Sequence, residues 1–291
     1  MSEIYYMSSN SEKIYLDRYP YWMQTGDFLN YTWPYTILND RILRFKKKPK
    51  ENGFKITIFG NSLDNYNANC NEIHEIFDKD IRNMSPGRLY FGEYYLVCYV
   101  FSSEKTEWEY DCNRHDNQFY IVTDKPDWIK ESTKQFFPQS SVDATDGLDY
   151  DFDYEFDYAP EQAGMERWYI DHYAPSDFNM IIFGPCVDPK ILVNGYPYQI
   201  YTELEESDYL VIDSRKHEIT KHMANGTTAN LYNSRSFEHS VFEKIPCGDV
   251  TFNWPGNFGF DVTLFLERSE PEFGSGSTYI ETETGKYMIT E

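Results

Sequence analysis

The stretch that decides the fold is residues 85–100, which read SPGRLYFGEYYLVCYV. Pro86 and Gly87 stop a helix and start a tight turn, because proline lacks the amide hydrogen that a helix needs and glycine tolerates unusual backbone angles. A short strand follows, and Gly92 leads into a second, longer strand. Since that second strand is apolar without alternation, it is predicted to be buried on both faces.

The residues before this stretch predict one amphipathic helix. Its apolar side chains recur at helical spacing, at Cys70, Ile73, Ile76, Phe77, Ile81 and Met84. Ser62 or Asp64 can cap its start, and acids occupy its opposite side, so the helix is expected to lie on a sheet. Short β-type runs broken by turns predict the strands of that sheet, at residues 13–16, 31–38, 41–45 and 54–59.

The composition limits what the chain can bind. Its 291 residues are enough for two domains, and a hydrophobic fraction of 41% excludes a disordered chain. The net charge of −22 argues against nucleic acid and anionic membranes as partners, since both repel an acidic surface. No apolar run approaches the roughly 18 residues of a membrane span, so no membrane insertion is expected. Five cysteines without CxxC spacing predict reduced, buried thiols.

A domain boundary is predicted around residues 149–158, which read DYDFDYEFDY. On a strand this segment has one aromatic and one acidic face, because successive side chains point to opposite sides. The aromatic face predicts that the segment docks, through Tyr150, Phe152, Tyr154 and Phe156. A solvated, mobile linker is the alternative. A calcium loop is disfavoured, because Tyr154 and Pro160 occupy the positions where an EF-hand has its glycine and its glutamate.

The second half of the chain predicts an all-β domain. It carries short strand-like runs, among them 180–183, 191–193, 209–212, 241–245 and 258–266. The pairs at 194–195 and 225–226, both Asn-Gly, predict two-residue hairpin turns. Such spacing is typical of a β-sandwich. The predicted organisation is a first domain over 1–142, an acidic and aromatic linker over 143–164, a sandwich over 165–271 and a flexible tail over 272–291.

Enzyme chemistry has no support in the sequence. P-loop, GxGxxG, HExxH and GxSxG motifs are all absent. His74 and Glu75 lack the second histidine of a zinc helix, and Cys112 with His115 gives half a metal site without a second pair. We therefore expect no enzyme activity, no cofactor and no metal. A cell-wall hydrolase is the weakest alternative, because no coherent nucleophile or metal set is present.

The order of several short motifs resembles the phage distal tail protein family, the structural proteins at the base of long non-contractile tails and of related prophage tails. In the first half these motifs are the helix ending in PGRLY, then GEYYLVCY, then a strand pair closing on DKPDW at 124–128. In the second half they are IFGP at 182–185, PKILVNG at 189–195, LVIDS at 210–214, FEKIPCG at 242–248 and ERSEP at 267–271.

The resemblance implies a mainly β fold, with an N-terminal β-sandwich-like domain that carries one α-helix and a C-terminal galectin-like β-sandwich. It implies a structural protein whose hexameric ring joins the tail tube to the tail tip or baseplate. The implied partners are further copies of the chain, the tail tube protein, a tail-tip hub or tail-associated lysin, and a receptor-binding protein. The implied location is the virion tail tip, and the host cytoplasm during assembly.

Two groups of residues are candidates for contacts. Concentrated positive charge occurs at Arg41, Arg44, Lys46, Lys47, Lys48 and Lys50. These cations either lie in a solvated loop or meet the acids of a neighbouring subunit. The alternative function, a carbohydrate-binding sandwich that aids attachment to the host cell wall, would use Trp168 and Trp254 as stacking platforms. Both tryptophans are equally suited to a sandwich core.

Overall fold

The computed structural model describes residues 3–106, 109, 112–139, 164–272, 280–281 and 287–288. They form two compact units, one from the residues up to Lys130 together with those from Glu267 onward, and one over Glu131–Leu266. The predicted docking residues Tyr150, Phe152, Tyr154 and Phe156 lie outside the described residues. The predicted linker and tail therefore stay predictions. Within the described part of the chain, no helix has the length and apolar character needed to cross a membrane.

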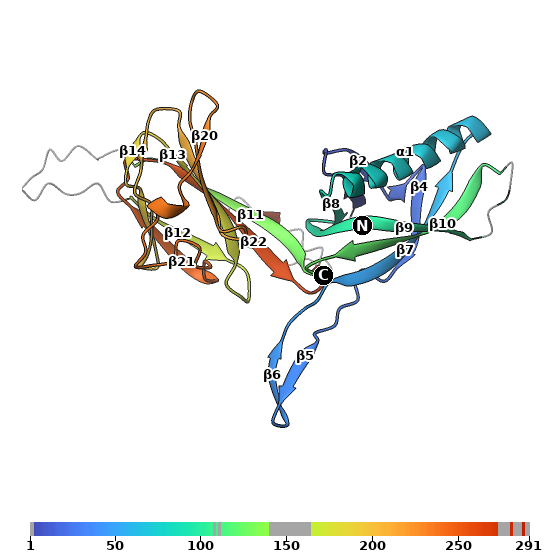
Figure 1. Ribbon diagram of the computed structural model, residues 1–291, viewed down its shortest axis with the longest axis horizontal. Coiled ribbons are helices and arrows are strands. Elements are labelled where there is room, and N and C mark those ends of the chain that lie inside the picture. Colours follow the sequence, from blue (N-terminus) through green and yellow to red (C-terminus); the bar gives the residue numbers. More distant parts are fainter. Residues whose placement is uncertain are drawn as a thin grey trace, which may run out of the picture. The chain divides into compact units, whose positions relative to one another are not determined.

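The first unit is an antiparallel sheet covered by one helix (Figure 1). The strands that run side by side in it are β9 (Tyr94–Thr106), β10 (Arg114–Thr123), β7 (Lys50–Phe59), β4 (Tyr21–Gly26) and β3 (Asp17–Arg18). Next to β9 lies β8 (Gly87–Phe91), followed by β1 (Ile4–Met7) and β2 (Lys13–Tyr15). The start of β11 (Trp128–Phe136) pairs with β9 at Ile129. The turn and strand pair predicted from residues 85–100 are confirmed.

Helix α1 (Leu63–Arg82) confirms the predicted amphipathic helix. The Ser62 hydroxyl caps it by accepting a hydrogen bond from the Asn65 amide at 3.2 Å. Apolar side chains such as Ile73 and Phe77 are buried against the sheet, as the helical spacing predicted. The expectation for Met84 is wrong: it follows the helix end, has a positive φ of 50° and is 78% exposed.

A buried carboxylate joins α1 to the N-terminal strands. Asp80 is fully buried and accepts hydrogen bonds from the Tyr6 hydroxyl at 2.7 Å and from the Ser9 amide and hydroxyl at 2.9 and 2.6 Å. Burial raises the pKa of Tyr6 above its ordinary value, so Tyr6 stays a donor. Gly87 lies against this group, because a β-carbon there would come 2.1 Å from the Tyr6 oxygen. The glycine of the SPGRLY stretch is thus required by a close approach.

The second unit is a β-sandwich. One sheet has the order β20 (Thr228–Asn230), β19 (Glu218–His222), β18 (Tyr209–Asp213), β13 (Asp177–Phe183) and β22 (Phe260–Arg268), with β11 beside β22. The other has the order β12 (Gly164–Ile170), β21 (Gly248–Trp254), β15 (Lys190–Val193) and β16 (Tyr196–Gln199). Short pieces complete the unit: β14 (Cys186–Val187), β17 (Glu203–Leu204) and the 3-10 turn η1 (Tyr232–Ser234). The predicted mainly β fold class with one α-helix is confirmed.

Alternating side chains from both sheets form the sandwich core. Phe178, Met180 and Ile182 of β13 are buried opposite Val250 and Phe252 of β21 in one cluster. Residues 241–245 form no strand, so that prediction is wrong. Val241 and Ile245 are nevertheless fully buried, because the apolar side chains attach an irregular segment to the core instead. Apolar character alone does not distinguish these two uses.

The two Asn-Gly pairs behave differently. Asn194 and Gly195 both have positive φ, 49° and 84°, and make the predicted two-residue turn between β15 and β16. The prediction at 225–226 is wrong, because five residues connect His222 to Thr228 there. Asp208 holds this longer loop by accepting a hydrogen bond from the Ala224 amide at 3.0 Å.

We expect Gly87→Ala to lower the free energy of unfolding by roughly 1–3 kcal/mol, because the new methyl group must displace Tyr6 or Asp80 from a packed site. Gly53→Ala is the matched control, since its new methyl group would meet mainly the far end of the Gln118 side chain. Urea unfolding measures both. Equal shifts of the two midpoints would contradict the role assigned to Gly87.

Candidate assembly surface

The most exposed element of the first unit is a hairpin between β4 and β7. Strands β5 (Tyr35–Leu38) and β6 (Arg41–Phe45) form a separate two-stranded sheet, in which every residue is exposed. Asn39 and Asp40 connect them with positive φ values of 48° and 59°, as a type I′ turn requires. Figure 1 shows the hairpin extending away from the sheet on the side opposite α1.

The register of the hairpin separates two kinds of side chain. Tyr35 lies opposite Phe45, and Ile37 opposite Ile42, so these four share one apolar face. Each of them is more than half exposed. The other face carries Thr36, Leu38, Arg41 and Arg44. A bulge between Thr36 and Ile37 leaves Leu43 without a cross-strand partner, and Leu43 is 61% exposed.

The exposed apolar side chains of this hairpin are not explained by the stability of the hairpin itself. An isolated two-stranded hairpin is at best marginally stable in water, because it has no layer to bury its side chains against. A contiguous exposed apolar patch usually marks an interaction site. The β5–β6 hairpin is therefore the best candidate on the first unit for a surface that another molecule covers.

The six basic residues between positions 41 and 50 divide into two groups. Lys47 is almost fully buried at the root of the hairpin, where its ammonium pairs with Asp127, donates to the Pro126 carbonyl at 3.1 Å and lies 4.6 Å from the Trp33 ring centroid. Lys50 donates to the Asn30 carbonyl at 2.5 Å. These two cations attach the hairpin to its own unit, so they are not available to a neighbour.

The remaining four cations are exposed: Arg41, Arg44, Lys46 and Lys48. None of them forms an ion pair with any residue that the structure describes. They fit the prediction of a charged contact surface better than Lys47 and Lys50 do. Sequence reasoning missed the apolar residues of the hairpin. The Asn-Asp break between two β-type runs was a signal for the hairpin, but not for its exposure.

The residues considered for metal binding are used differently. His115 is buried, and its Nδ1 shares a hydrogen bond of 2.5 Å with the Tyr66 hydroxyl. Its Nε2 is also buried and has no hydrogen-bond partner among the described residues. His74 packs on the Phe119 ring at 5.6 Å. In the described part of the chain, no three His, Cys, Asp or Glu side chains come together as a metal site requires.

The two tryptophans proposed for sugar stacking lie at or in the sandwich core. Trp254 is 3% exposed, and its indole NH donates to the Phe258 carbonyl at 3.0 Å. A β-carbon on Gly164 would come 2.5 Å from that indole, so the ring is covered on this side. Trp168 is half-buried and packs near Phe252, with ring centroids 6.2 Å apart. Trp254 thus has no ring face open to a ligand.

No protein-family model matches this chain, and no curated protein matches it. Solved structures do. The Dit protein of phage SPP1, described as a paradigm of the hub adsorption apparatus in phages that infect Gram-positive bacteria, is similar with a TM-score of 0.57 and 5% identity, over 91% of this chain and 99% of that one. Chains of the phage P2 baseplate in its activated conformation, with Ca and with Sr, give TM-scores of 0.58 and 0.59 at 12% identity, over 93% of this chain and 100% of theirs.

These similarities extend over both units rather than one. They confirm, at the level of the fold, the resemblance to phage distal tail proteins that the short motifs predicted. Identities of 5–12% are too low to carry over single residues. The contact surfaces of this chain are therefore identified from its own side chains.

We expect the stability of the first unit to fall as the pH drops below about 6.5. Burial lowers the pKa of His115 and of His74, and Lys105 lowers both further, while Asp116 opposes the shift at His115. Below the ordinary histidine pKa the unfolded chain therefore binds more protons than the folded one, so its stability rises with pH there. Each histidine can contribute a slope of up to about 1.4 kcal/mol per pH unit.

The variant His115→Asn tests this expectation, because asparagine can still bond Tyr66 but cannot ionise. The free energy of unfolding, measured with urea at a series of pH values from 7.5 to 5, should change less with pH for the variant than for the parent chain. If the free energy of unfolding changes equally with pH in both proteins, His115 takes no part in the pH dependence.

Proposed function

We propose that this chain is a structural distal tail protein of a phage or prophage. It forms a hexameric ring that joins the tail tube to the tail tip or baseplate, and it has no enzymatic role. The shared fold with the Dit protein of phage SPP1, a hub protein, over almost the whole length of both chains supports this function. The observation that carries it is the hairpin β5–β6, in which every residue is exposed and one face is apolar.

A closed ring needs two different surfaces on each subunit, because each copy contacts its two neighbours head to tail. The hairpin supplies one such surface. Its side chains gain on the order of 25 cal/mol for each Å² of apolar area that a neighbour covers. The exposed cations beside it favour the same partner, since every other copy of this chain carries a net charge of −22.

The further partners that this function implies are the tail tube protein, a tail-tip hub or tail-associated lysin, and a receptor-binding protein. The proposed location is the virion tail tip, after assembly in the host cytoplasm. We assign the ring contacts to the first unit, because the hairpin belongs to it. The sandwich of the second unit is then left for contacts with other tail components.

Light scattering and negative-stain imaging of the purified chain test the proposal. We expect a six-fold ring. The variant Ile42→Asp should abolish it while changing the circular dichroism and the melting temperature little, because Ile42 is 56% exposed and belongs to no buried core cluster. Met84→Asp, another exposed apolar position of the first unit, is the control and should keep the ring. A parent chain that remains monomeric at its highest soluble concentration would contradict the proposed function.

The exposed cations make a separate prediction. The double variant Lys46→Glu, Lys48→Glu should weaken ring formation at low salt, and the difference from the parent should shrink as salt screens the charges. Lys47 is left intact, because it anchors the hairpin through Asp127. Rings that are equally stable in both proteins at every salt concentration would exclude a role for these charges.

A further inference from the structure

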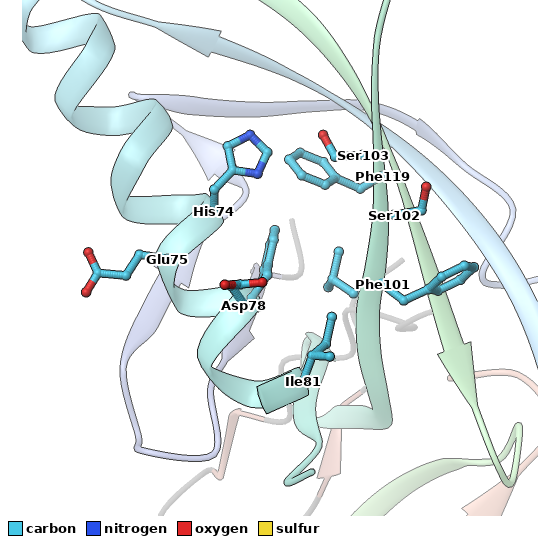
Figure 2. Close-up of a pocket in the computed structure, with 10 residues that line it drawn as sticks. His74, Glu75, Asp78, Ile81, Phe101, Ser102, Ser103 and Phe119 are labelled. Atoms are coloured by element: carbon cyan, nitrogen blue, oxygen red, sulfur yellow. The ribbon is translucent and has the colours of Figure 1, made fainter. Parts of the chain in front are cut away.

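A groove lies between α1 and β9, on the helix-covered side of the first unit's sheet. Its volume is about 350 Å³. The buried rings of Phe77 and Phe119 and the side chain of Val100 form its floor, and Ile81 lies half-buried in it. Figure 2 shows Ile81 and Asp78 on the helix beside this space, with Phe101 on the strand across from them.

The strand side of the groove is irregular. The pairing of β9 with β10 shifts between Tyr120 and Ile121, which leaves Phe101 as an extra residue on β9. Phe101 is 44% exposed, although the residues on either side of it line the same groove. A bulge of this kind re-aims a side chain and interrupts regular pairing. Figure 2 shows the Phe101 ring on the side of β9 that faces away from α1.

The helix side of the groove carries an acid that can accept another donor. Asp78 uses Oδ2 to bind the Arg82 guanidinium at 2.6 Å, and its Oδ1 has no hydrogen-bond partner among the described residues. Glu75, one turn earlier, pairs with Lys79 at 3.1 Å. Figure 2 shows the Glu75 carboxylate directed away from the groove. The lining of the groove is thus mixed: the rings of Phe77 and Phe119 lie beside Asp78 and the polar side chains of His74, Ser102 and Ser103.

The hairpin has the complementary properties. Its apolar face offers Ile37 and Ile42, which are aliphatic side chains of a size that this groove can hold, and Arg41 and Arg44 on its opposite face add positive charge. It cannot reach the groove of its own chain, because it extends from the side of the sheet opposite α1 (Figure 1). A contact between the hairpin and the groove therefore has to join two different copies of the chain.

We propose that the groove between α1 and β9 is the site that receives the β5–β6 hairpin of a neighbouring copy. This inference rests on the proposed ring and names its second surface. Ile37 and Ile42 of one copy enter the groove over Phe77 and Phe119 of the next, and the exposed cations of the hairpin bring positive charge towards the acid at Asp78. Since the hairpin and the groove are distinct surfaces on opposite sides of one unit, the contact is head to tail, as a closed ring requires.

A photo-reactive p-benzoyl-phenylalanine at position 42 tests the location directly. After irradiation of assembled rings, a denaturing gel should show cross-linked dimers. Mass spectrometry of these dimers should place the attachment in the peptides that carry residues 75–81 or 100–103. The same probe at position 84, which is exposed in the first unit but outside the hairpin, is the control and should not yield those peptides.

A matched pair of charge reversals provides the second test. Asp78→Arg should raise the dissociation constant for assembly by about tenfold or more, because it replaces the acid at the rim by a cation that repels the hairpin. Glu75→Arg makes the same charge change on the same helix and breaks a similar exposed ion pair. Glu75 also lines the groove, but its carboxylate is directed away from it (Figure 2). The Glu75→Arg variant should leave assembly within about twofold of the parent.

The outcomes separate this inference from the ring itself. Rings that form normally while position 42 cross-links elsewhere, or while Asp78→Arg and Glu75→Arg behave alike, overturn the groove and leave the proposed function standing. A parent chain that forms no ring and no cross-linked dimer overturns both. Cross-links to the groove together with selective loss in Asp78→Arg support the inference.

Discussion

Lys47 and Asp127 form an ion pair from which water is almost excluded, with side-chain exposures of 6% and 13%. Burying two charges is costly, and the cost is recovered only when the remaining donors and acceptors are also satisfied. Here the ammonium also reaches the Pro126 carbonyl and the Trp33 ring. The root of the hairpin is thus held in one place, although its two strands are exposed along their whole length.

The same contact connects three parts of the first unit. Trp128 follows Asp127 directly, is 1% exposed, and packs in the core against Phe28 with ring centroids 6.0 Å apart. Trp128 is also the first residue of β11, one of the strands that crosses from the first unit's residues into the second's. The orientation of the hairpin therefore depends on the core and not on a loop. A surface that has to meet a neighbour benefits from such an anchor, because less conformational freedom is lost on binding.

The sequence predicted an element correctly where the spacing of its apolar residues is compatible with only one type of secondary structure. The apolar spacing around Ile73 and Phe77 is helical, and the helix forms there. The Asn-Gly pair at 194–195 makes its predicted turn, whereas the same pair at 225–226 lies in a longer loop that Asp208 holds. The hairpin shows the limit of that reasoning. The apolar residues of β5 and β6 read the same in the sequence whether they pack on their own chain or on another one. Likewise, positions 46, 47 and 48 are all lysine. Only the structure shows that Lys47 differs from the other two, because it forms an ion pair with Asp127, 80 residues away in the sequence.

The strong negative charge and the apolar hairpin act over different distances. Repulsion between like-charged chains extends to about the Debye length, roughly 8 Å at physiological ionic strength, whereas apolar burial begins only at contact. Charge repulsion therefore acts on two approaching copies before their hairpins can form apolar contacts. In the proposed ring, an encounter leads to binding only when the hairpin of one copy meets the groove of the next. For the proposed ring, the balance of these two forces implies that assembly depends on both the concentration of the chain and the salt concentration.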